Sequence, residues 1–368
     1  MNTGYRPGPA LRKALAAKLG ELLRSFPGLK GWTMDRIASP QDGGFDFRVA
    51  LPAARGRHVD ILVQCKAEPR PSQFPYAGAP QWAPSAIPVF AAPHISSNLA
   101  EICQQHGWSW FDLAGNCHIE VPGLLFLERK GNEPVRRPPR PRANLSTPES
   151  ARVVRALLVG EGSVKPWTQR EMQNETQLPD QPSVSLGLVN KVAQYLRDEA
   201  FIESTPDGFR LRDPLKLLFA WRNAYRFDRH QQRRYFTLKK AAELREDLAR
   251  LESDVRGEVA YCAFSAADFQ APHVRQPKTW LFVSAELEEK FASATEAKVV
   301  DSGENLMVLL PNDAGVFYLA DAEAGRLACT NPVQTYVDLW HCGGRGREAA
   351  EALLEQKLKP EWKLRRPL

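Results

Sequence analysis

The chain has 368 residues, a formal net charge of +6 and a pI near 9.0, so we expect two or three domains and a polyanionic partner. Its 6 cysteines form no Cys-x-x-Cys pair, which excludes a disulfide framework and a zinc site and favours a reducing cytoplasm. No apolar run approaches about 18 residues and the start lacks a signal-peptide core, so we expect a cytoplasmic protein without a membrane span or a cofactor.

Residues 1–133 alternate helical and strand patterns and predict an α/β domain. Leucines on one stripe predict an amphipathic helix over Leu11–Phe26. Phe45–Leu51 and His58–Cys65 alternate like two paired strands. The other elements expected here are a strand over Ile87–Ala92, a helix over Ile95–His106, and strands over Trp108–Asp112, Cys117–Val121 and Leu124–Glu128.

Asp46 on the first of the paired strands and Gln64-x-Lys66 on the second match the layout of restriction-type nucleases. In that layout two carboxylates gather around a magnesium ion, and the lysine helps to activate water. Here Gln64 stands where the second acid belongs, and a neutral amide is a weaker ligand for a hard cation. The sequence therefore predicts a restriction-endonuclease-like domain that holds no metal and has lost catalysis, with a metal-dependent nuclease as the alternative.

Asp112-Leu-Ala-Gly115-Asn116 lies between two predicted strands. An Asp and an Asn around a Gly could be catalytic. We favour a tight turn, in which Gly115 and Asn116 supply positive φ and Asp112 accepts hydrogen bonds from backbone amides.

Residues 134–147 are rich in arginine and proline, which predicts a solvated linker because proline removes backbone donors and like charges repel. This segment adjoins the DNA-binding candidate described next, so its arginines could instead contact DNA phosphates. The candidates are Arg137, Arg140 and Arg142.

Residues 148–214 have the pattern of a winged helix-turn-helix. Thr147 and Thr168 are caps for a first and a second helix, and Ser185 caps a third over Leu186–Glu199. In this third helix Val189, Val192, Ala193 and Leu196 form the buried stripe. The opposite face carries Gly187, Lys191, Gln194 and Tyr195, flanked by Asn190 and Arg197.

A hairpin follows, with Asp207-Gly208 as its turn and Phe209–Arg212 as its return strand. Arg210 and Arg212 alternate around Leu211, so both are expected to point away from the core. The pattern predicts binding of duplex DNA, and the alternative is a winged helix used for protein contact. The predicted contact residues are Thr168, Arg170, Ser185, Gly187, Asn190, Lys191, Gln194, Tyr195, Arg197, Arg210 and Arg212.

Residues 215–368 predict a separate α+β domain. Expected helices are Leu215–Tyr225, Leu238–Leu251, Pro332–Trp340 and Arg347–Leu358. Expected strands are Glu258–Cys262, Thr279–Val283, Asn305–Leu310 and Val316–Leu319.

The chain resembles the AbiEi-type antitoxins of type IV toxin–antitoxin systems, and more narrowly their long subgroup with a restriction-endonuclease-like N-terminal region. The residues that carry the resemblance are Val59–Lys66, Pro88–Pro93, Trp110–Asn116, Val184–Val189, Pro332–Leu339 and Arg345–Gly346. The strings Asp-Leu-Ala-Gly-Asn and Pro-Val-Gln-x-Tyr-x-Asp-Leu are the more specific ones. The subgroup usually has Glu-x-Lys where this chain has Gln64-x-Lys66.

The resemblance implies a repressor that binds operator DNA of its own operon. It also implies an antitoxin that counters a nucleotidyltransferase-type toxin without forming a stable complex, through the region from about Leu215. A solitary regulator without a toxin would have the same sequence features.

Overall fold

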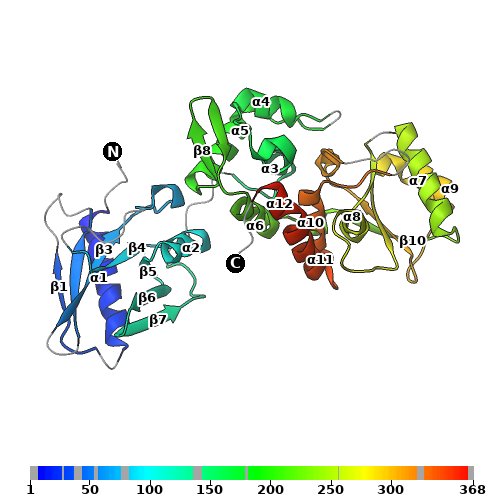
Figure 1. Cartoon of the computed structure of the whole chain (residues 1–368). Coiled ribbons are helices and arrows are strands. Elements are labelled where there is room, and N and C mark those ends of the chain that lie inside the picture. The colour runs from blue at the N-terminus through cyan, green and yellow to red at the C-terminus, as the bar shows by residue number, and fades with distance from the viewer. Residues whose placement is uncertain are drawn as a thin grey trace. The chain divides into compact units, whose positions relative to one another are not determined.

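The computed structural model describes residues 7–26, 29–36, 44–53, 57–75, 83–135, 143–178, 181–255, 257–320 and 327–363. The chain divides into two compact units, Met1–Arg140 and Pro141–Leu368, each described by itself below (Figure 1). The division falls within the predicted linker. The linker residues Arg137, Arg140 and Arg142 lie outside the described residues.

A seven-stranded mixed sheet forms the centre of the first unit, with the strands side by side in chain order. The strands are β1 (Thr33–Arg36), β2 (Phe47–Pro52), β3 (His58–Cys65), β4 (Ile87–Ala92), β5 (Ser109–Asp112), β6 (Cys117–Val121) and β7 (Leu125–Arg129). β3, β4 and β5 are parallel, and the pairs on either side of them are antiparallel. A short 3₁₀ turn, η2 (Pro71–Gln73), lies between β3 and β4.

Two helices cover opposite faces of this sheet. Helix α1 (Pro9–Arg24) buries the predicted leucine stripe against Ile61 and Val63 of β3. Helix α2 (Ser97–Gln105) packs instead against Leu62, the β3 residue that points to the other face, because successive strand side chains alternate. The predicted strand over Phe45–Leu51 starts later, at Phe47, and β1 was not predicted.

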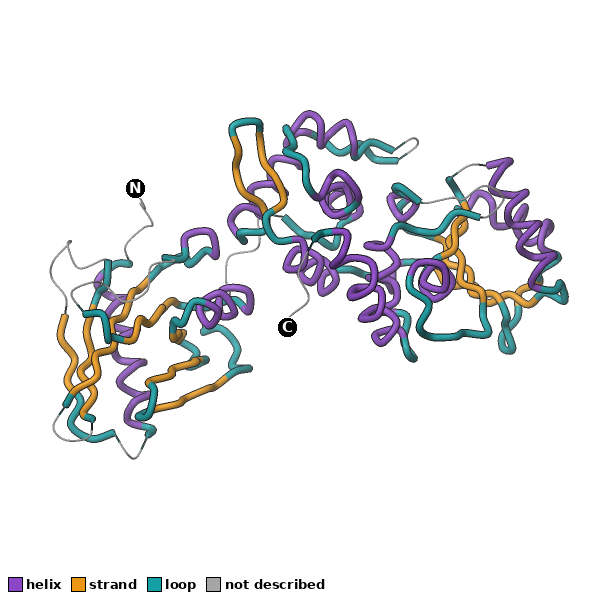
Figure 2. Tube along the Cα trace, viewed as in Figure 1, coloured by secondary structure: helices purple, strands orange, loops and turns teal. Residues whose placement is uncertain are grey.

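The second unit begins with three helices and a hairpin (Figure 2). These are α3 (Pro148–Leu158), α4 (Gln169–Glu175), α5 (Leu186–Asp198), β8 (Ile202–Thr205) and β9 (Gly208–Leu211), with a 3₁₀ turn η3 (Gly160–Ser163) after α3. A backbone bridge between Trp167 and Phe209 ties the segment before α4 to the return strand of the hairpin. Helix α6 (Pro214–Ala224) follows. We call α3, α4, α5 and the hairpin the three-helix unit.

A five-stranded sheet organises the rest of the second unit, in the order β11-β12-β14-β10-β13. The strands are β10 (Gln231–Phe236), β11 (Val259–Tyr261), β12 (Thr279–Val283), β13 (Lys298–Val299) and β14 (Leu306–Leu310). β12 and β14 are parallel, and the other pairs are antiparallel.

Helices cover both faces of this second sheet. Helices α7 (Ala241–Val255) and α9 (Glu288–Thr295) pack on one face, and α8 (Ala263–Gln270) and α10 (Pro332–His341) pack on the other. The remaining elements are η4 (Phe227–Arg229), η5 (Ala285–Leu287), η6 (Ala314–Phe317), α11 (Gly346–Leu353), the π-helical turn η7 (Leu354–Leu358) and α12 (Lys359–Glu361).

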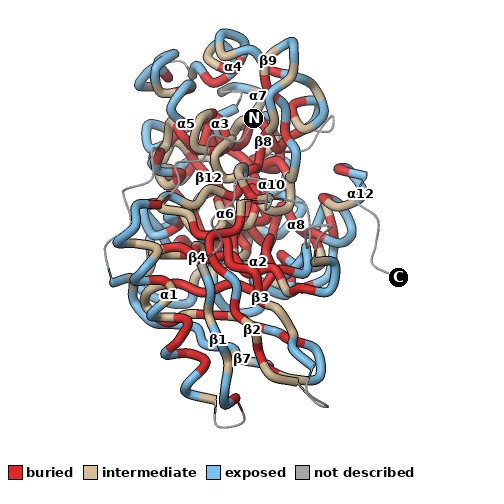
Figure 3. Tube along the Cα trace, turned by 90° about the vertical axis from the view of Figure 1, so that its left-hand side faces the viewer, coloured by how far each residue is buried: buried red, intermediate tan, exposed pale blue. Residues whose placement is uncertain are grey.

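One hydrophobic core runs from the three-helix unit into the C-terminal part of the second unit, whose buried residues are marked in Figure 3. It joins Val153 of α3, Val192 of α5 and Trp221 of α6 to Val333 of α10 and Leu353 of α11. The predicted domain boundary after residue 214 therefore does not separate two cores.

Two further predictions needed correction in this unit. Val316–Leu319 is not a strand: η6 occupies Ala314–Phe317, because Asp313 caps a 3₁₀ turn by accepting a hydrogen bond from the Gly315 amide. Arg347–Leu358 was predicted as one regular helix, but the α-helical hydrogen bonding of α11 ends at Leu353 and the π-helical turn η7 covers Leu354–Leu358. The strands β10 and β13 and the helices α8 and α9 were not predicted. Within the described ranges, no helix has the length and apolar character needed to cross a membrane.

Candidate nucleic-acid interface

Helix α5 presents the predicted face. The Ser185 hydroxyl accepts a hydrogen bond from the Leu188 amide at 3.2 Å, which caps the helix. The predicted stripe Val189, Val192, Ala193 and Leu196 is buried. Ser185, Gly187, Asn190 and Lys191 are exposed on the other side, and Gln194 and Arg197 are half-buried. The first half of α5 thus exposes a polar surface with one cation.

Tyr195 departs from the predicted face. Its ring packs against the core, and burial raises the pKa of its phenol to about 12. The reason is helical geometry, since adjacent residues are about 100° apart around the axis. Tyr195 therefore lies about 100° from both Gln194 and the buried Leu196, at the edge of the polar face, where its ring can reach the core.

Helices α4 and α5 are joined by amide hydrogen bonds from glutamines. The Gln169 side chain donates to Asn190 Oδ1 at 3.0 Å. The Gln173 and Gln177 amides donate to the Val184 carbonyl, at 3.2 and 2.9 Å. These three residues were not predicted; Gln169 and Gln173 are spaced by four on α4 and share a helical face, and Gln177 follows the end of the helix.

Thr168 serves as a structural cap of α4. Its hydroxyl accepts from the Glu171 amide at 3.1 Å, and the Glu171 carboxylate accepts from the Thr168 amide at 2.8 Å. This reciprocal arrangement is a capping box. Arg170, two residues after Thr168, is exposed. Among the residues that the structure describes, neither Arg170 nor Lys191 forms an ion pair, so both cations are available to a phosphate.

The hairpin turn differs by one residue from the prediction. Thr205 pairs with Gly208, so Pro206 and Asp207 are the central turn residues and Gly208 opens β9. Gly208 has φ +135°, and a Cβ there would lie 2.1 Å from the Trp167 carbonyl oxygen. The glycine is needed because the strand passes so close to the Trp167 backbone.

Both hairpin arginines lie on the surface, as predicted. Leu211 between them is buried. The Arg210 Nε lies 2.6 Å from Glu203 Oε1 on the opposite strand. An exposed pair of this kind contributes little to stability, so the arginine can exchange this carboxylate for a phosphate at small cost.

Two buried arginines anchor α3 to the C-terminal part of the unit. Arg152 Nε donates to both Asp313 carboxylate oxygens, at 3.2 and 3.0 Å, and its Nη1 donates to the Pro182 carbonyl at 2.8 Å. Arg155 Nε donates to Gln334 Oε1 of α10 at 2.8 Å. The Arg155 guanidinium also lies over the Trp221 ring, 5.1 Å from its centroid. These contacts fix α3 against α6, α10 and η6.

A chain of hydrogen bonds continues from Gln334 into the interior. Gln334 Nε2 donates to Tyr225 Oη and to Asp338 Oδ1, each at 2.8 Å, and Tyr225 donates to the same Asp338 oxygen at 2.7 Å. His230 Nε2 lies 2.7 Å from Tyr225 Oη, and His230 Nδ1 accepts from the Asn312 amide at 3.3 Å. Since Nδ1 is an acceptor and the Tyr225 proton goes to Asp338, the imidazole is neutral with its proton on Nε2.

Burial shifts the pKa of both ends of this chain. Desolvation, together with the charge of Arg155, lowers the pKa of His230 to about 4. Desolvation raises the pKa of Asp338 to about 7, against the opposing effects of its hydrogen bonds from Tyr225 and Gln334. None of these groups was predicted to have a functional role.

The nuclease-like positions of the first unit do lie together. The Asp46 amide donates to the Val63 carbonyl at 2.7 Å, which places Asp46, just before β2, opposite Gln64. However, Asp46 Oδ2 accepts from the Cys65 amide at 2.7 Å, and Arg12 Nη1 lies 3.5 Å from Oδ1. A cation binding here would compete with this guanidinium.

Gln64 is buried, and its Oε1 has no hydrogen-bond partner among the described atoms. No group of three or more His, Cys, Asp or Glu side chains in the described ranges could hold a metal ion. The one carboxylate at this position therefore has a structural role in joining α1, β2 and β3.

The Asp112–Asn116 segment has the geometry of a turn. Asp112 is fully buried, and its carboxylate accepts from the Asn116 amide and from the Asn116 side chain, both at 3.0 Å. Gly115 has φ +86°, but Asn116 does not share this conformation, contrary to our expectation. Instead the Asn116 side chain bonds to the Asn132 backbone, so that it closes the loop without strain.

Comparison with known proteins finds a likeness in the C-terminal part of the chain. No curated protein and no solved structure matches it. Residues 210–359 match the family model described as "Transcriptional regulator, AbiEi antitoxin, Type IV TA system". The match begins in β9 and does not include α3, α4 or α5. It covers most of the region, from about Leu215, that the sequence resemblance implied to carry the antitoxin role. The chain from the end of the hairpin to Lys359 is therefore similar to the AbiEi antitoxins, transcriptional regulators of type IV toxin–antitoxin systems.

Proposed function

We propose that this protein is a transcriptional regulator that binds operator DNA through α5 and the hairpin. The observation that carries the proposal is the exposed polar half of α5 beside a hairpin with two outward arginines, in a chain whose adjoining segment matches the AbiEi family. Helix–helix–helix–hairpin is the element order of a winged helix-turn-helix, and the third helix is then the one that enters the major groove.

The chemistry of the exposed residues supports DNA over a protein partner. The half-buried Gln194 can pair bidentately with an adenine edge, and the exposed Lys191 and Arg170 can contact phosphates. Apolar exposure on this surface is limited to single residues such as Leu186, which is 39% exposed. A protein-docking helix would be expected to carry a contiguous apolar face instead.

We further propose that the C-terminal part acts as an antitoxin against a nucleotidyltransferase-type toxin encoded with it. The family match supports this role. Co-expression tests it: growth arrest caused by the neighbouring nucleotidyltransferase gene should be relieved by this chain. The Lys191→Ala variant should still relieve the growth arrest, because this proposal places DNA binding on α5 and toxin neutralisation on the C-terminal part. A chain that binds its promoter but never relieves arrest would be a solitary regulator.

For the first unit we propose a restriction-endonuclease-like domain without nuclease activity. Two observations support the loss of chemistry: Asp46 is engaged by Arg12 and the Cys65 amide, and Gln64 replaces the second carboxylate. Asp60, the next acid along β3, is paired with Arg48 at 2.7 Å and is not available as a replacement.

The DNA-binding proposal is tested by fluorescence anisotropy with duplexes from the chain's own promoter region. Four to six phosphate contacts predict a log–log salt slope of about −4 to −5, since each contact contributes roughly 0.9. Lys191→Ala should weaken specific and random duplexes alike. Gln194→Ala should cost about 1–3 kcal/mol on the operator only and relax the preference at one base pair.

Lys357→Ala is the matched control, because it removes an exposed lysine in η7 while leaving the three-helix unit unchanged. It should bind like the wild type. A flat salt response, or wild-type affinity in both α5 variants, would rule out this face as the DNA-binding surface.

A further inference from the structure

A cavity of about 510 Å³ lies in the second unit, at the end of the five-stranded sheet where β12 and β14 begin. Its walls come from the first turns of α7, the second half of α8 and the loop that leads into β12. The lining residues include Arg245, Asp268, Phe269, Gln276 and Thr279. Its size is within the range of small-ligand pockets, roughly 300–1,000 Å³. The DNA-binding proposal makes no use of it.

The charged side chains in the cavity fall into two groups. Lys239 is engaged, with its Nζ 2.6 Å from Asp247 Oδ2, and Lys278 is paired with Glu304. In contrast, Arg245 and Asp268 form no ion pair or hydrogen bond with any residue that the structure describes. Partial burial without a compensating cation raises the pKa of Asp268. The wall thus presents one cation and one carboxylate that lack partners.

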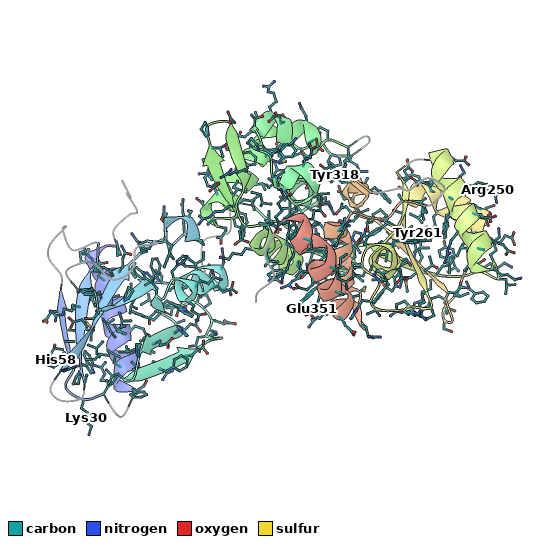
Figure 4. All side chains as sticks on the ribbon, viewed as in Figure 1. Lys30, His58, Arg250, Tyr261, Tyr318 and Glu351 are labelled. Atoms are coloured by element: carbon teal, nitrogen blue, oxygen red, sulfur yellow. The ribbon has the colours of Figure 1, made fainter. Side chains whose placement is uncertain are left out.

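An aromatic ring forms another part of the wall. Phe269 is 43% exposed, which is high for a phenylalanine that lines a cavity. It packs on the buried Tyr261, labelled in Figure 4, with the ring centroids 5.4 Å apart and the planes tilted by 36°. Tyr261 holds one side of the ring in place, and a planar ligand could cover the exposed part.

We propose that this cavity binds a small anionic molecule with a planar ring, of the mononucleotide class. Arg245 would contact the phosphate, the ring would stack on Phe269, and Asp268 would accept hydrogen bonds from ribose hydroxyls or base amino groups. Gln276 and the Thr279 hydroxyl supply further donors and acceptors at the rim. A carboxylate that accepts from ribose hydroxyls is a recurrent feature of nucleotide sites.

A simpler aromatic acid satisfies this wall less well. It would pair with Arg245 and stack on Phe269, but it would leave the exposed Asp268 carboxylate without a donor. Hydrogen bonds to a charged group are stronger than neutral ones, so a ligand that supplies donors to this carboxylate binds more tightly. Nucleotides have such donors in their ribose hydroxyls, and an unsubstituted aromatic acid such as benzoate has none.

Isothermal titration of the full chain tests the proposal. The probes are the four ribonucleoside monophosphates, with inorganic phosphate and benzoate as comparison ligands. At least one nucleotide should bind, and both comparison ligands should bind at least tenfold more weakly. Loss of a stacked ring costs about 5- to 150-fold in affinity, so Phe269→Ala should fall in this range. Arg245→Ala should also weaken binding at least tenfold.

Arg250→Ala is the matched control, because it removes the same charge from the exposed surface of α7 outside the cavity. It should bind the nucleotide like the wild type. Circular dichroism should show wild-type folding for the Phe269 and Arg245 variants, whose side chains are exposed. Promoter binding without nucleotide should also be unchanged, which separates this test from that of the DNA-binding surface. The proposal is overturned if no nucleotide binds at millimolar concentration, if benzoate binds as tightly, or if neither variant weakens binding.

Discussion

Replacing His230 by glutamine is expected to make the second unit more resistant to acid than the wild type. His230 titrates at about 4 in the folded protein, below its ordinary value of 6.5. As the pH falls from 6.5 to 4, the unfolded imidazole takes up a proton and the folded one does not, so the wild type loses stability. Each pH unit between the two pKa values corresponds to 1.36 kcal/mol, which gives about 3 kcal/mol.

Replacing Asp338 by asparagine is expected to have the opposite effect. The pKa of Asp338 is about 7 in the folded protein, above its ordinary value of 3.8. As the pH falls through 7, the folded carboxyl takes up a proton while the unfolded one stays ionised, so the wild type gains up to about 4 kcal/mol. Asp338→Asn removes this gain and leaves the loss from His230. The two groups oppose each other in the wild type because burial disfavours the charged form of each, which is the protonated form of His230 and the ionised form of Asp338.

Differential scanning calorimetry of the full chain between pH 7.5 and 4.5 measures both effects. The relevant quantity is the difference in Tm between each variant and the wild type, because the other titrating groups cancel. For a unit of this size 3 kcal/mol corresponds to roughly 6–12 °C. The difference should rise on acidification for His230→Gln and fall for Asp338→Asn. Parallel curves for the two variants would refute the assignment of a neutral imidazole and a readily protonated carboxyl to this chain.

Two further predictions concern buried and lost charges. Asp313→Ala leaves the Arg152 guanidinium buried without its ion-pair partner, which should lower the free energy of unfolding measured in urea by about 3–5 kcal/mol. Adding Arg152→Met should recover most of this loss. A loss below about 1 kcal/mol for Asp313→Ala alone would contradict the buried ion pair. Incubated with plasmid in magnesium or manganese beside a Lys66→Ala control, the wild type should not cleave, because Asp46 is the one carboxylate at the site. Cleavage by the wild type and not by the control would restore the nuclease alternative.

Regular periodicity is what made much of the fold predictable from the sequence. The leucines of α1 and the stripe of Val189, Val192 and Leu196 follow the 3.6-residue repeat, and the structure buries them. Strands β3, β4 and β12 are short apolar runs and were predicted within two residues of their bounds. Local caps such as Ser185 and Thr168 depend on neighbours in sequence and were found for this reason.

The elements that were missed lack such local signals. Strand β10 is exposed over Gln231–Arg234, so no alternation of apolar and polar residues marks it. Arg152 and Arg155 would be placed on a solvated face by their charge. Their burial depends on Asp313 and Gln334, which are 161 and 179 residues away in sequence. A contact between residues so far apart in sequence produces no periodic pattern, so the burial of these arginines could not be predicted from one sequence.

The family-like string Pro-Val-Gln-x-Tyr-x-Asp-Leu has an internal role in this fold. Its Gln334 and Asp338 are fully buried, and they meet Arg155 and Tyr225 instead of solvent. Arg155 belongs to α3, outside the segment 210–359 that matches the antitoxin family, so the string forms the joint between that segment and the helices proposed to read DNA. Removing one partner of a buried charged contact is strongly destabilising, so the packing of the three-helix unit against the antitoxin-like segment depends on residues from both parts. A substitution at Gln334 should therefore alter operator binding through the position of α3, although Gln334 itself is not on the DNA-facing surface. The effect of any substitution in the string is best interpreted first as a change in the packing of α3.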